Sequence, residues 1–348
     1  MNNVFDFIKR IRKQKHIDRN YAHRYAFVGI GNHSINNLYP VLSYLNVPLK
    51  YIVVKSRQTA EVVNKNYGAI IGTVDYETVL NDPEIGGVFI CAAPQHHFSL
   101  VKSALLKHKN VFVEKPPCMS TSELEQLTEI RAKSDRICLI GFQKRYSRCA
   151  AILKKRLPVE KIISYNYRFL TGAYPEGDVY RDLFVHPIDL ATYLFGEPEL
   201  ISTAKTEQSK GQTTLFLQLR HKNVVGNIEI SSQYAWNQAT EDICINTVSG
   251  VYRMENFQSL VYKPKPKTLF SIPTEKIRPQ FLEQQHLYNT NDFLPVFQNN
   301  TLVSHGYFDE IKTFVDLCEN RKTKNLSTLE MIKPVFEIIE KTIIFAKI

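Results

Sequence analysis

Residues 25–34, with the sequence YAFVGIGNHS, join a short apolar run to two glycines that are one residue apart. The apolar run over residues 25–28 predicts a buried β-strand. Gly29 permits a tight turn out of that strand, and Gly31 lets the backbone approach a pyrophosphate at the N-terminus of the next helix. Ser34 takes the place of the third glycine of the G-x-G-x-x-G pattern and is small enough for close packing. Because glycine turns after strands are common, the segments that follow have to decide the fold.

Strand-like and helix-like segments alternate after this turn. The predicted strands are residues 49–54, 88–91, 111–113 and 137–140, and the predicted helices are residues 35–45, 59–67, 97–107 and 120–133. This spacing is typical of an α/β fold with a doubly wound parallel sheet. We therefore expect a dinucleotide-binding Rossmann domain over residues 25–146.

Longer alternating runs follow. Residues 162–169, 213–220, 224–231 and 243–248 predict antiparallel strands, and helical patterns return at residues 186–194 and from residue 307 onward. We expect these segments to form a second α/β domain over residues 147–348; its role in binding substrate and in oligomerisation is what the family resemblance given below implies.

Composition limits the class of protein. Of the 348 residues 44% are hydrophobic and no run of eighteen apolar residues occurs, so we expect a globular protein without a transmembrane helix. The six cysteines form no C-x-x-C pair. This pattern disfavours a disulfide framework or a zinc site and favours a reducing cytoplasm.

The net charge of +10 is partly local. Residues 1–24, a basic N-terminal extension, hold seven lysines and arginines against two aspartates, and Val4, Ile8 and Ile11 fall on one helical face. Such a helix can lie on anionic lipid or can be a solvated arm packed on its own protein, and we favour the second interpretation. Aromatic and basic residues do not interleave as they do in nucleic-acid-binding modules, so we expect no nucleic acid partner.

The end of the second predicted strand bears on the choice of dinucleotide. A carboxylate about twenty residues beyond the glycines would bind the ribose 2′-hydroxyl of NAD. This chain has Lys55, Ser56 and Arg57 at that place. Two cations suit a 2′-phosphate, so we favour NADP(H). The alternative is NAD(H) bound beside a solvated basic turn.

Lys115 follows the predicted buried strand over residues 111–113 and precedes Pro116 and Pro117. Residues just beyond a parallel strand emerge at the carboxyl edge of the sheet, where ligands bind in open α/β folds. A cation at that edge can stabilise a developing alkoxide. The alternative is a surface lysine paired with Glu114.

Asp182, His186 and Asp189 are spaced by four and three residues. Pro187 predicts that a helix begins there, which places Asp182 in the loop before it. Histidine suits general acid–base work because its ordinary pKa is about 6.5, and Asp182 could reach the imidazole or the lysine. A histidine is also often structural, and we expect Asp189 to cap or pack rather than to act in catalysis.

Together these segments resemble the Gfo/Idh/MocA oxidoreductases. The resemblance rests on the glycine turn, the Glu114-Lys115-Pro116 triplet, residues 141–146 (GFQKRY) and the spaced Asp182, His186 and Asp189. It implies a Rossmann domain followed by an α/β domain with an open, mostly antiparallel sheet, which in this family often forms dimer interfaces. It also implies that the lysine and the histidine act at the substrate hydroxyl beside the nicotinamide, with the aspartate in support.

We therefore expect an NAD(P)-dependent enzyme that transfers a hydride between the cofactor and a secondary alcohol or ketone of a sugar-like substrate (a sugar, an inositol or a nucleotide sugar). We expect it to be a homodimer or homotetramer. The alternative is a non-catalytic regulator that senses a dinucleotide or a sugar on the same fold. Phe184 stands where many family members have glycine, which would narrow or reshape the pocket.

The candidate site residues fall into three groups. The candidate catalytic residues are Lys115, His186 and Asp182. The candidate cofactor-binding residues are Gly29, Gly31, Asn32, His33, Ser34, Lys55, Ser56, Arg57, Ala93, Pro94, His97, Glu114 and Lys115. The candidate substrate-binding residues are Arg145, Tyr146, Arg168, Tyr174, Asp182 and His186.

Overall fold

In a computed structural model, the chain folds into two compact units. One unit comprises Met1–Gly141 and Tyr307–Glu330, and the other comprises Phe142–Gly306 and Met331–Ile348. The residues that the structure describes are 4–10, 20–266, 268–270, 272–276, 283–291, 293 and 297–345. Residues 1–3 and 11–19 of the predicted N-terminal extension therefore lie outside the described residues.

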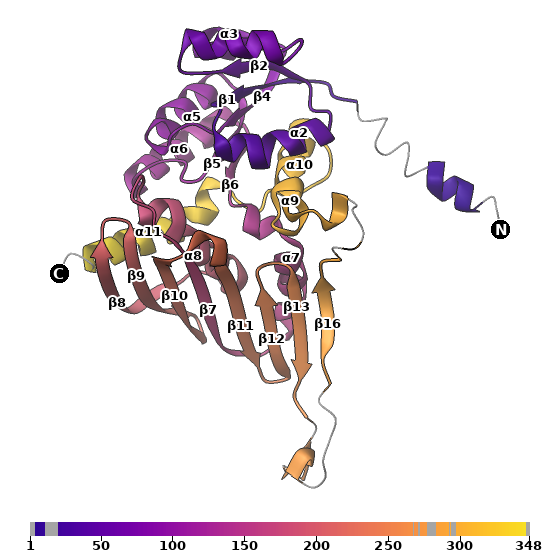
Figure 1. Cartoon of the computed structure of the whole chain (residues 1–348), viewed down its shortest axis with the longest axis vertical. Helices are drawn as coiled ribbons and strands as arrows, with labels where there is room; N and C mark the ends of the chain where they lie inside the picture. The colour runs from indigo at the N-terminus through magenta and orange to yellow at the C-terminus, as the bar shows by residue number, and fades with distance from the viewer. Residues whose placement is uncertain are drawn as a thin grey trace. The chain divides into compact units, whose positions relative to one another are not determined.

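The first unit is built on a six-stranded sheet in the order β3-β2-β1-β4-β5-β6 (Figure 1). Its strands are β1 (Arg24–Val28), β2 (Leu49–Val53), β3 (Ile71–Thr73), β4 (Ile85–Ile90), β5 (Asn110–Glu114) and β6 (Cys138–Gly141). Its helices include α2 (Tyr39–Tyr44), α3 (Arg57–Asn66), α4 (Tyr76–Asn81), α5 (His97–Leu106), α6 (Thr121–Ser134) and α10 (Tyr307–Cys318). Every strand pair is parallel, which confirms the predicted Rossmann sheet.

Aromatic side chains join α10 to this sheet. The rings of Phe89 in β4 and Phe112 in β5 lie 5.5 Å apart, and the ring of Phe314 in α10 lies 5.0 Å from the first and 5.9 Å from the second. All three side chains are fully buried. The segment containing α10 therefore belongs to the first unit, whereas the sequence placed it in the second domain. Its apolar face is complementary to the Rossmann core, and the order of segments in the chain does not reveal this.

The helix after the glycine turn begins with a wide turn. Ser34–Leu38 is π-helical, and α2 continues from it with Pro40 at its second position. Proline has no N–H to donate to the preceding turn, so an α-helical bond is missing there. The predicted helix over residues 35–45 is confirmed, with this local irregularity at Pro40.

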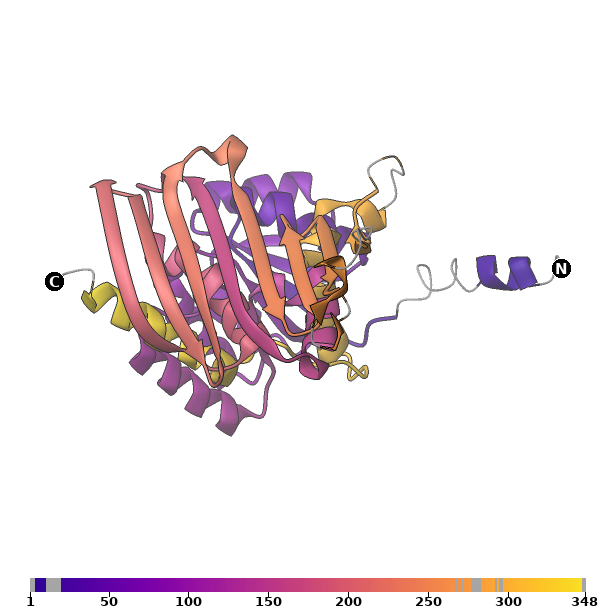
Figure 2. The ribbon, with the colours of Figure 1, turned by 90° about the horizontal axis from the view of Figure 1, so that it is seen from below.

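The second unit is built on an eight-stranded sheet in the order β16-β13-β12-β11-β7-β10-β9-β8, whose twist is visible in Figure 2. Its strands are β7 (Ile162–Gly172), β8 (Glu199–Ser209), β9 (Gln212–His221), β10 (Val224–Tyr234), β11 (Thr240–Thr247), β12 (Gly250–Glu255), β13 (Ser259–Pro264) and β16 (Gln285–Asn289). Its helices include α7 (Arg148–Arg156), α8 (Val185–Phe195), α9 (Thr301–Ser304) and most of α11 (Leu329–Phe345). The short strands β14 (Thr268–Leu269) and β15 (Ile272–Pro273) pair separately. Only β7 and β10 pair in parallel among the described strands of the large sheet, so the mostly antiparallel sheet is confirmed.

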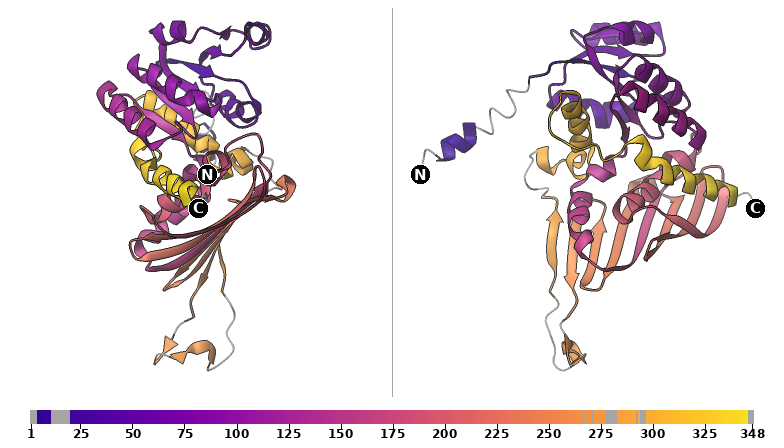
Figure 3. Two further views of the ribbon diagram at one scale, coloured as in Figure 1. Left: turned by 90° about the vertical axis from the view of Figure 1, so that its left-hand side faces the viewer. Right: turned by 180° about the vertical axis from the view of Figure 1, so that it is seen from behind.

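The two faces of the large sheet differ. Along β7, Tyr165 and Tyr167 are buried, whereas Asn166 and Arg168 are exposed. Phe195 of α8 stacks on Tyr165 with ring centres 4.2 Å apart. One face therefore packs against a helix, while the other is open; Figure 3 shows the strands of this sheet as one curved layer. Among the described residues, no helix combines the length and the apolar composition that spanning a bilayer requires.

Candidate functional site

The glycine turn follows β1 at the point where the strand order of the first sheet reverses. Gly29 has φ of 101°, and a Cβ there would lie 2.3 Å from the carbonyl oxygen of Cys91, so only glycine fits. A Cβ on Gly31 would meet nothing within 4 Å among the described residues. The backbone at Gly31 is therefore open to close approach by a ligand, as binding of a dinucleotide pyrophosphate requires.

Ser34 closes this turn. Its hydroxyl accepts a hydrogen bond from the Gly31 N–H and donates one to the Gly31 carbonyl, both at 2.9 Å. The side chain is fully buried. The serine at the third glycine position is small, and it also fixes the turn through two hydrogen bonds to Gly31. We call this pair of hydrogen bonds the serine clamp.

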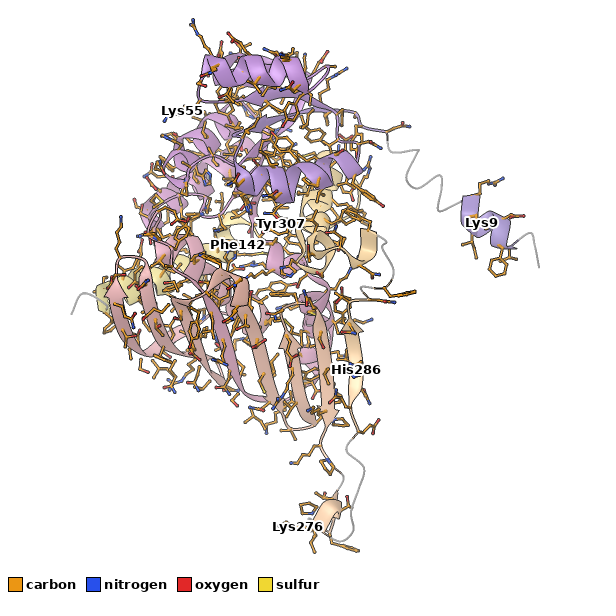
Figure 4. All side chains as sticks on the ribbon, in the orientation of Figure 1. Lys9, Lys55, Phe142, Lys276, His286 and Tyr307 are labelled. Carbon is orange, nitrogen blue, oxygen red and sulfur yellow. The ribbon has the colours of Figure 1, made fainter. Side chains whose placement is uncertain are left out.

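His33 connects the turn to the end of β5. Its Nε2 lies 3.1 Å from Oε1 of Glu114, and its ring lies edge-on to Tyr307 at 5.8 Å (Figure 4 labels Tyr307). Burial lowers the pKa of His33, but the carboxylate of Glu114 outweighs it and the pKa is raised overall. Burial raises the pKa of Glu114, but His33 and Lys115 outweigh it and the pKa is lowered overall. When His33 is protonated, the two side chains form an ion pair directly before the candidate catalytic lysine.

Lys115 is half-buried at the carboxyl end of β5, as predicted from the strand before it. The neighbouring backbone is fixed by His97, whose Nδ1 lies 2.7 Å from the carbonyl oxygen of Pro116 and whose Nε2 lies 2.9 Å from that of Ala92. Burial lowers the pKa of His97. Because both ring nitrogens face backbone carbonyls, His97 holds the chain after β4 and after β5 together. These contacts give His97 a structural role, and its predicted contact with the cofactor stays a prediction.

The basic residues after β2 are exposed. Lys55 (labelled in Figure 4) and Arg57 have no ion pair within the part of the chain that the structure describes. Ser56 caps α3, because its hydroxyl accepts a hydrogen bond from the Thr59 N–H at 3.1 Å. The two cations are thus accessible at the carboxyl edge of the sheet. Asn32 is exposed within the glycine turn, and Ala93 and Pro94 begin the turn after β4.

In the second unit, Asp182 and His186 lie in one helical run. The π-helical segment Val179–Phe184 continues directly into α8. Asp178 starts this run, because its carboxylate accepts hydrogen bonds from two backbone N–H groups at 3.0 and 3.2 Å. The prediction that Asp182 lies in a loop is therefore wrong. The run begins at the Asp178 cap, and Pro187 lies within it just after the π-helical turns, where the irregular bonding accommodates its missing N–H.

The surroundings of Asp182 hold its carboxylate in place. The Asp178 N–H donates to its Oδ2 at 3.1 Å, and the Tyr174 hydroxyl forms a hydrogen bond with it. Burial and the Asp182 charge raise the pKa of Tyr174 to about 12. His186 is buried, and its ring lies edge-on to Phe142 at 6.4 Å (labelled in Figure 4). Tyr174, predicted to contact substrate, therefore contacts the candidate catalytic aspartate.

Two arginines predicted to bind substrate have structural partners. Arg145 is 2% exposed and donates to both carboxylate oxygens of Asp189 at 2.6–3.2 Å, which fits the packing role predicted for Asp189. The predicted contact of Arg145 with substrate stays a prediction. Arg168 pairs with Glu229 at 2.8 Å on the open face of the large sheet. Arg168 and α8 therefore lie on opposite faces of this sheet, and the predicted contact of Arg168 with substrate stays a prediction. Tyr146 is buried.

A second buried ion pair escaped the sequence reasoning. Lys144 donates to both carboxylate oxygens of Glu241 at 2.6 and 2.7 Å, and the Tyr167 hydroxyl donates to the same carboxylate. Glu241 occupies the alternation that Ile243 and Ile245 follow along β11. A charged residue at a position that alternation assigns to the core was the signal for this pair.

Known proteins resemble the first part of this chain. Residues 23–142 match the GFO_IDH_MocA family model, described as an oxidoreductase family with an NAD-binding Rossmann fold. The scyllo-inositol 2-dehydrogenase (NAD(+)) of Bacillus subtilis is 31% identical over 147 residues, which cover 39% of this chain and 43% of that protein. Similar matches cover 39% to 43% of three curated relatives, so the matched region corresponds to less than half of their length.

Solved structures extend the likeness of the fold to most of the chain. A dehydrogenase from Chromobacterium violaceum has a TM-score of 0.77 at 17% identity, over 94% of this chain and 96% of that chain. Levoglucosan dehydrogenase in complex with NADH and L-sorbose has a TM-score of 0.75 at 14% identity, over 94% of this chain and 97% of that chain. The fold and the glycine turn define an α/β protein with a Rossmann domain. Residues 23–142 are similar to the Gfo/Idh/MocA family, which confirms the resemblance noted from the sequence.

Proposed function

We propose that this protein is an oxidoreductase that transfers a hydride between a nicotinamide dinucleotide and a secondary alcohol or ketone of a sugar-like substrate. The observation that carries this proposal is the pairing of two features at one edge of the first sheet. The open backbone at Gly31 follows β1, and Lys115 follows β5. Both lie within the residues that match an NAD-binding oxidoreductase family.

Each candidate residue has a distinct role in this reaction. When bound, the dinucleotide accepts or supplies the hydride. Lys115 donates a hydrogen bond to the reacting substrate oxygen and stabilises negative charge on it. In oxidation, His186 in its neutral form takes the hydroxyl proton, and in reduction it returns the proton. Asp182, which is held by Tyr174 and the Asp178 N–H, orients the histidine and balances its charge.

The substrate class is proposed from the relatives and from the breadth of the family. Several relatives are named as inositol dehydrogenases. Sugars, inositols and nucleotide sugars all carry the secondary alcohol that these roles require. Phe184 is fully buried beside Tyr180. We keep the prediction that Phe184 alters the pocket relative to family members with glycine.

We propose either NAD(H) or NADP(H) as the cofactor, whereas the sequence favoured NADP(H). The family model and the NADH-bound neighbour both name NAD, and no comparison supports a preference for NADP(H). That preference rests on Lys55 and Arg57 alone. Fluorescence titration with NADPH and NADH tests it, with the Lys55→Ala/Arg57→Ala double variant as the comparison. If a 2′-phosphate is recognised there, the double variant loses about tenfold or more in NADPH affinity and little in NADH affinity. A preference of the wild-type protein for NADH would contradict the NADP(H) preference that Lys55 and Arg57 predict.

A hydride-exchange assay tests the enzymatic proposal. The protein is mixed with NAD(H) or NADP(H) and a panel of sugars, inositols and nucleotide sugars, and absorbance of the reduced nicotinamide is followed. Lys115→Ala should abolish turnover and leave dinucleotide affinity near normal, while the exposed Lys133→Ala serves as the control. Dinucleotide binding without exchange on any substrate would favour the regulator that senses a dinucleotide or a sugar.

We also propose that the protein is a homodimer or homotetramer. The open face of the large sheet carries the half-exposed Phe216 and a shallow groove lined by Arg168 and Glu229, and sheets of this kind often form dimer interfaces in the resembling family. Light scattering of the full chain measures the mass. A monomer at micromolar concentration would contradict the proposal.

A further inference from the structure

The short helix over residues 4–10 exposes its apolar side chains. Val4 is 62% exposed, Phe5 66%, Phe7 55% and Ile8 42%. Large apolar groups so exposed and so close together mark an interaction surface. The alternative is the earlier prediction that the extension packs on its own protein, and the experiment below separates the two.

The same helix separates apolar from charged side chains. At 100° per residue, the four apolar residues fall within an arc of about 160°. Asp6, Lys9 and Arg10 fall on the rest of the circumference; Figure 4 labels Lys9 on this helix. Residues 1–24 carry seven lysines and arginines against two aspartates. The helix is thus amphipathic, and the N-terminal extension to which it belongs is strongly cationic.

The identity of the partner follows from these two properties taken together. A nucleic acid would engage the cations but would leave the phenylalanines in water. A second copy is a poor electrostatic match, since the chain has a net charge of +10. An anionic bilayer surface accepts both groups, because its headgroups attract lysine and arginine and its acyl boundary accepts phenylalanine. We propose that residues 4–10 dock this protein in the plane of an anionic lipid surface.

The base of the extension is fixed to the first unit. The Glu319 carboxylate accepts hydrogen bonds from the Ala22 N–H at 2.7 Å and from the Tyr25 hydroxyl at 2.8 Å. The Arg321 guanidinium donates to the carbonyl oxygen of Asn20 at 2.7 Å. Docking of the helix therefore tethers the Rossmann unit through a fixed attachment at residues 20–25.

Vesicle co-sedimentation of the full chain tests this proposal. Vesicles of phosphatidylglycerol with phosphatidylcholine should bind the protein, vesicles of phosphatidylcholine alone should bind it weakly, and binding should fall as salt rises. Lys9→Glu/Arg10→Glu should weaken binding about tenfold or more, whereas the matched Lys133→Glu/Arg136→Glu variant on the exposed surface of the first unit should bind nearly as wild type. Phe5→Ser/Phe7→Ser should also lose about tenfold or more, with the exposed Phe293→Ser as its control.

Every other outcome overturns the proposal. Absence of binding to anionic vesicles at low salt would do so, as would equal losses in the arm variants and their controls. A change of oligomeric mass in Phe5→Ser/Phe7→Ser, without vesicle binding by the wild type, would identify a second copy as the occupant. Binding to duplex DNA but not to vesicles would identify a nucleic acid. None of these results depends on hydride transfer, so the proposed enzymatic function stands or falls separately.

Discussion

The two units differ in how they build their candidate sites. In the first unit the glycine turn consists of backbone, a serine clamp and the partly exposed His33–Glu114 pair. In the second unit the residues around the candidate histidine are organised by ion pairs that are almost fully buried, above all Arg145–Asp189. A site built from backbone groups needs few residues, all close in sequence. A buried ion pair, by contrast, makes the stability of the whole unit depend on two positions that are distant in sequence.

Among the variants that test this comparison, removal of one partner of a buried ion pair should have the largest effect on stability. Asp189→Ala leaves the Arg145 guanidinium buried without its counter-ion, so we expect a loss of about 3–5 kcal/mol in the free energy of unfolding. Chemical denaturation measured by circular dichroism checks this value. The matched control is Glu229→Ala, which breaks the exposed pair with Arg168 and should cost at most about 1 kcal/mol. Equal losses in the two variants would mean that burial does not set the contribution of these pairs.

The glycine turn should respond next most strongly. Gly29→Ala places a Cβ 2.3 Å from the Cys91 carbonyl oxygen at a positive φ, so we expect a loss of about 2–4 kcal/mol and weaker dinucleotide binding. Thermal unfolding and NADH titration measure both effects. Gly68→Ala is the control, since it has φ of 63° and no atom within 4 Å of the added carbon, and it should cost only about 1 kcal/mol. A small loss for Gly29→Ala would show that the turn can relax.

The serine clamp should have a smaller effect. Ser34→Ala removes two hydrogen bonds to Gly31, and we expect a loss of about 1–2 kcal/mol together with a measurable fall in dinucleotide affinity. The exposed Ser99→Ala, which loses one hydrogen bond to the His96 carbonyl, should change neither quantity appreciably. Unchanged dinucleotide affinity in Ser34→Ala would show that the serine clamp contributes to stability but not to dinucleotide binding.

The His33–Glu114 pair should show the smallest effect and a distinct pH dependence. The raised pKa of His33 means that its contribution is complete below about 6.5 and is lost as the pH rises through the raised value. The lowered pKa of Glu114 means that its contribution is present above about 4.5 and is lost as the pH falls through the lowered value.

The stability difference between wild type and His33→Gln should therefore be greatest between these limits and should shrink above neutral pH. Because the His33 side chain is 42% exposed, solvent screening keeps the difference below about 1 kcal/mol. Urea unfolding at a series of pH values measures it. A difference that grows toward alkaline pH would contradict the assigned ion pair.

The sequence predicted the parallel sheet well because its strands are continuous apolar runs. It missed β3, which has only three residues and therefore too little periodicity to detect. It placed Asp182 in a loop, because Pro187 is a stronger local signal than the cap at Asp178. It could not predict the partner of Arg145 or of Lys144, since each acid lies many residues away and only the fold brings it near.

The return of the chain to the first unit has a consequence for synthesis on the ribosome. Phe314 packs on Phe89 and Phe112, and the Glu319 carboxylate accepts a hydrogen bond from Ala22 just before β1. Phe314 and Glu319 are synthesised roughly 170 residues after β6 is complete. At about 5–20 residues per second, the nascent Rossmann unit waits roughly ten to thirty-five seconds for its last helix. During that interval the aromatic face lacks its native cover, so the nascent chain should be a substrate for chaperones that bind exposed apolar surface.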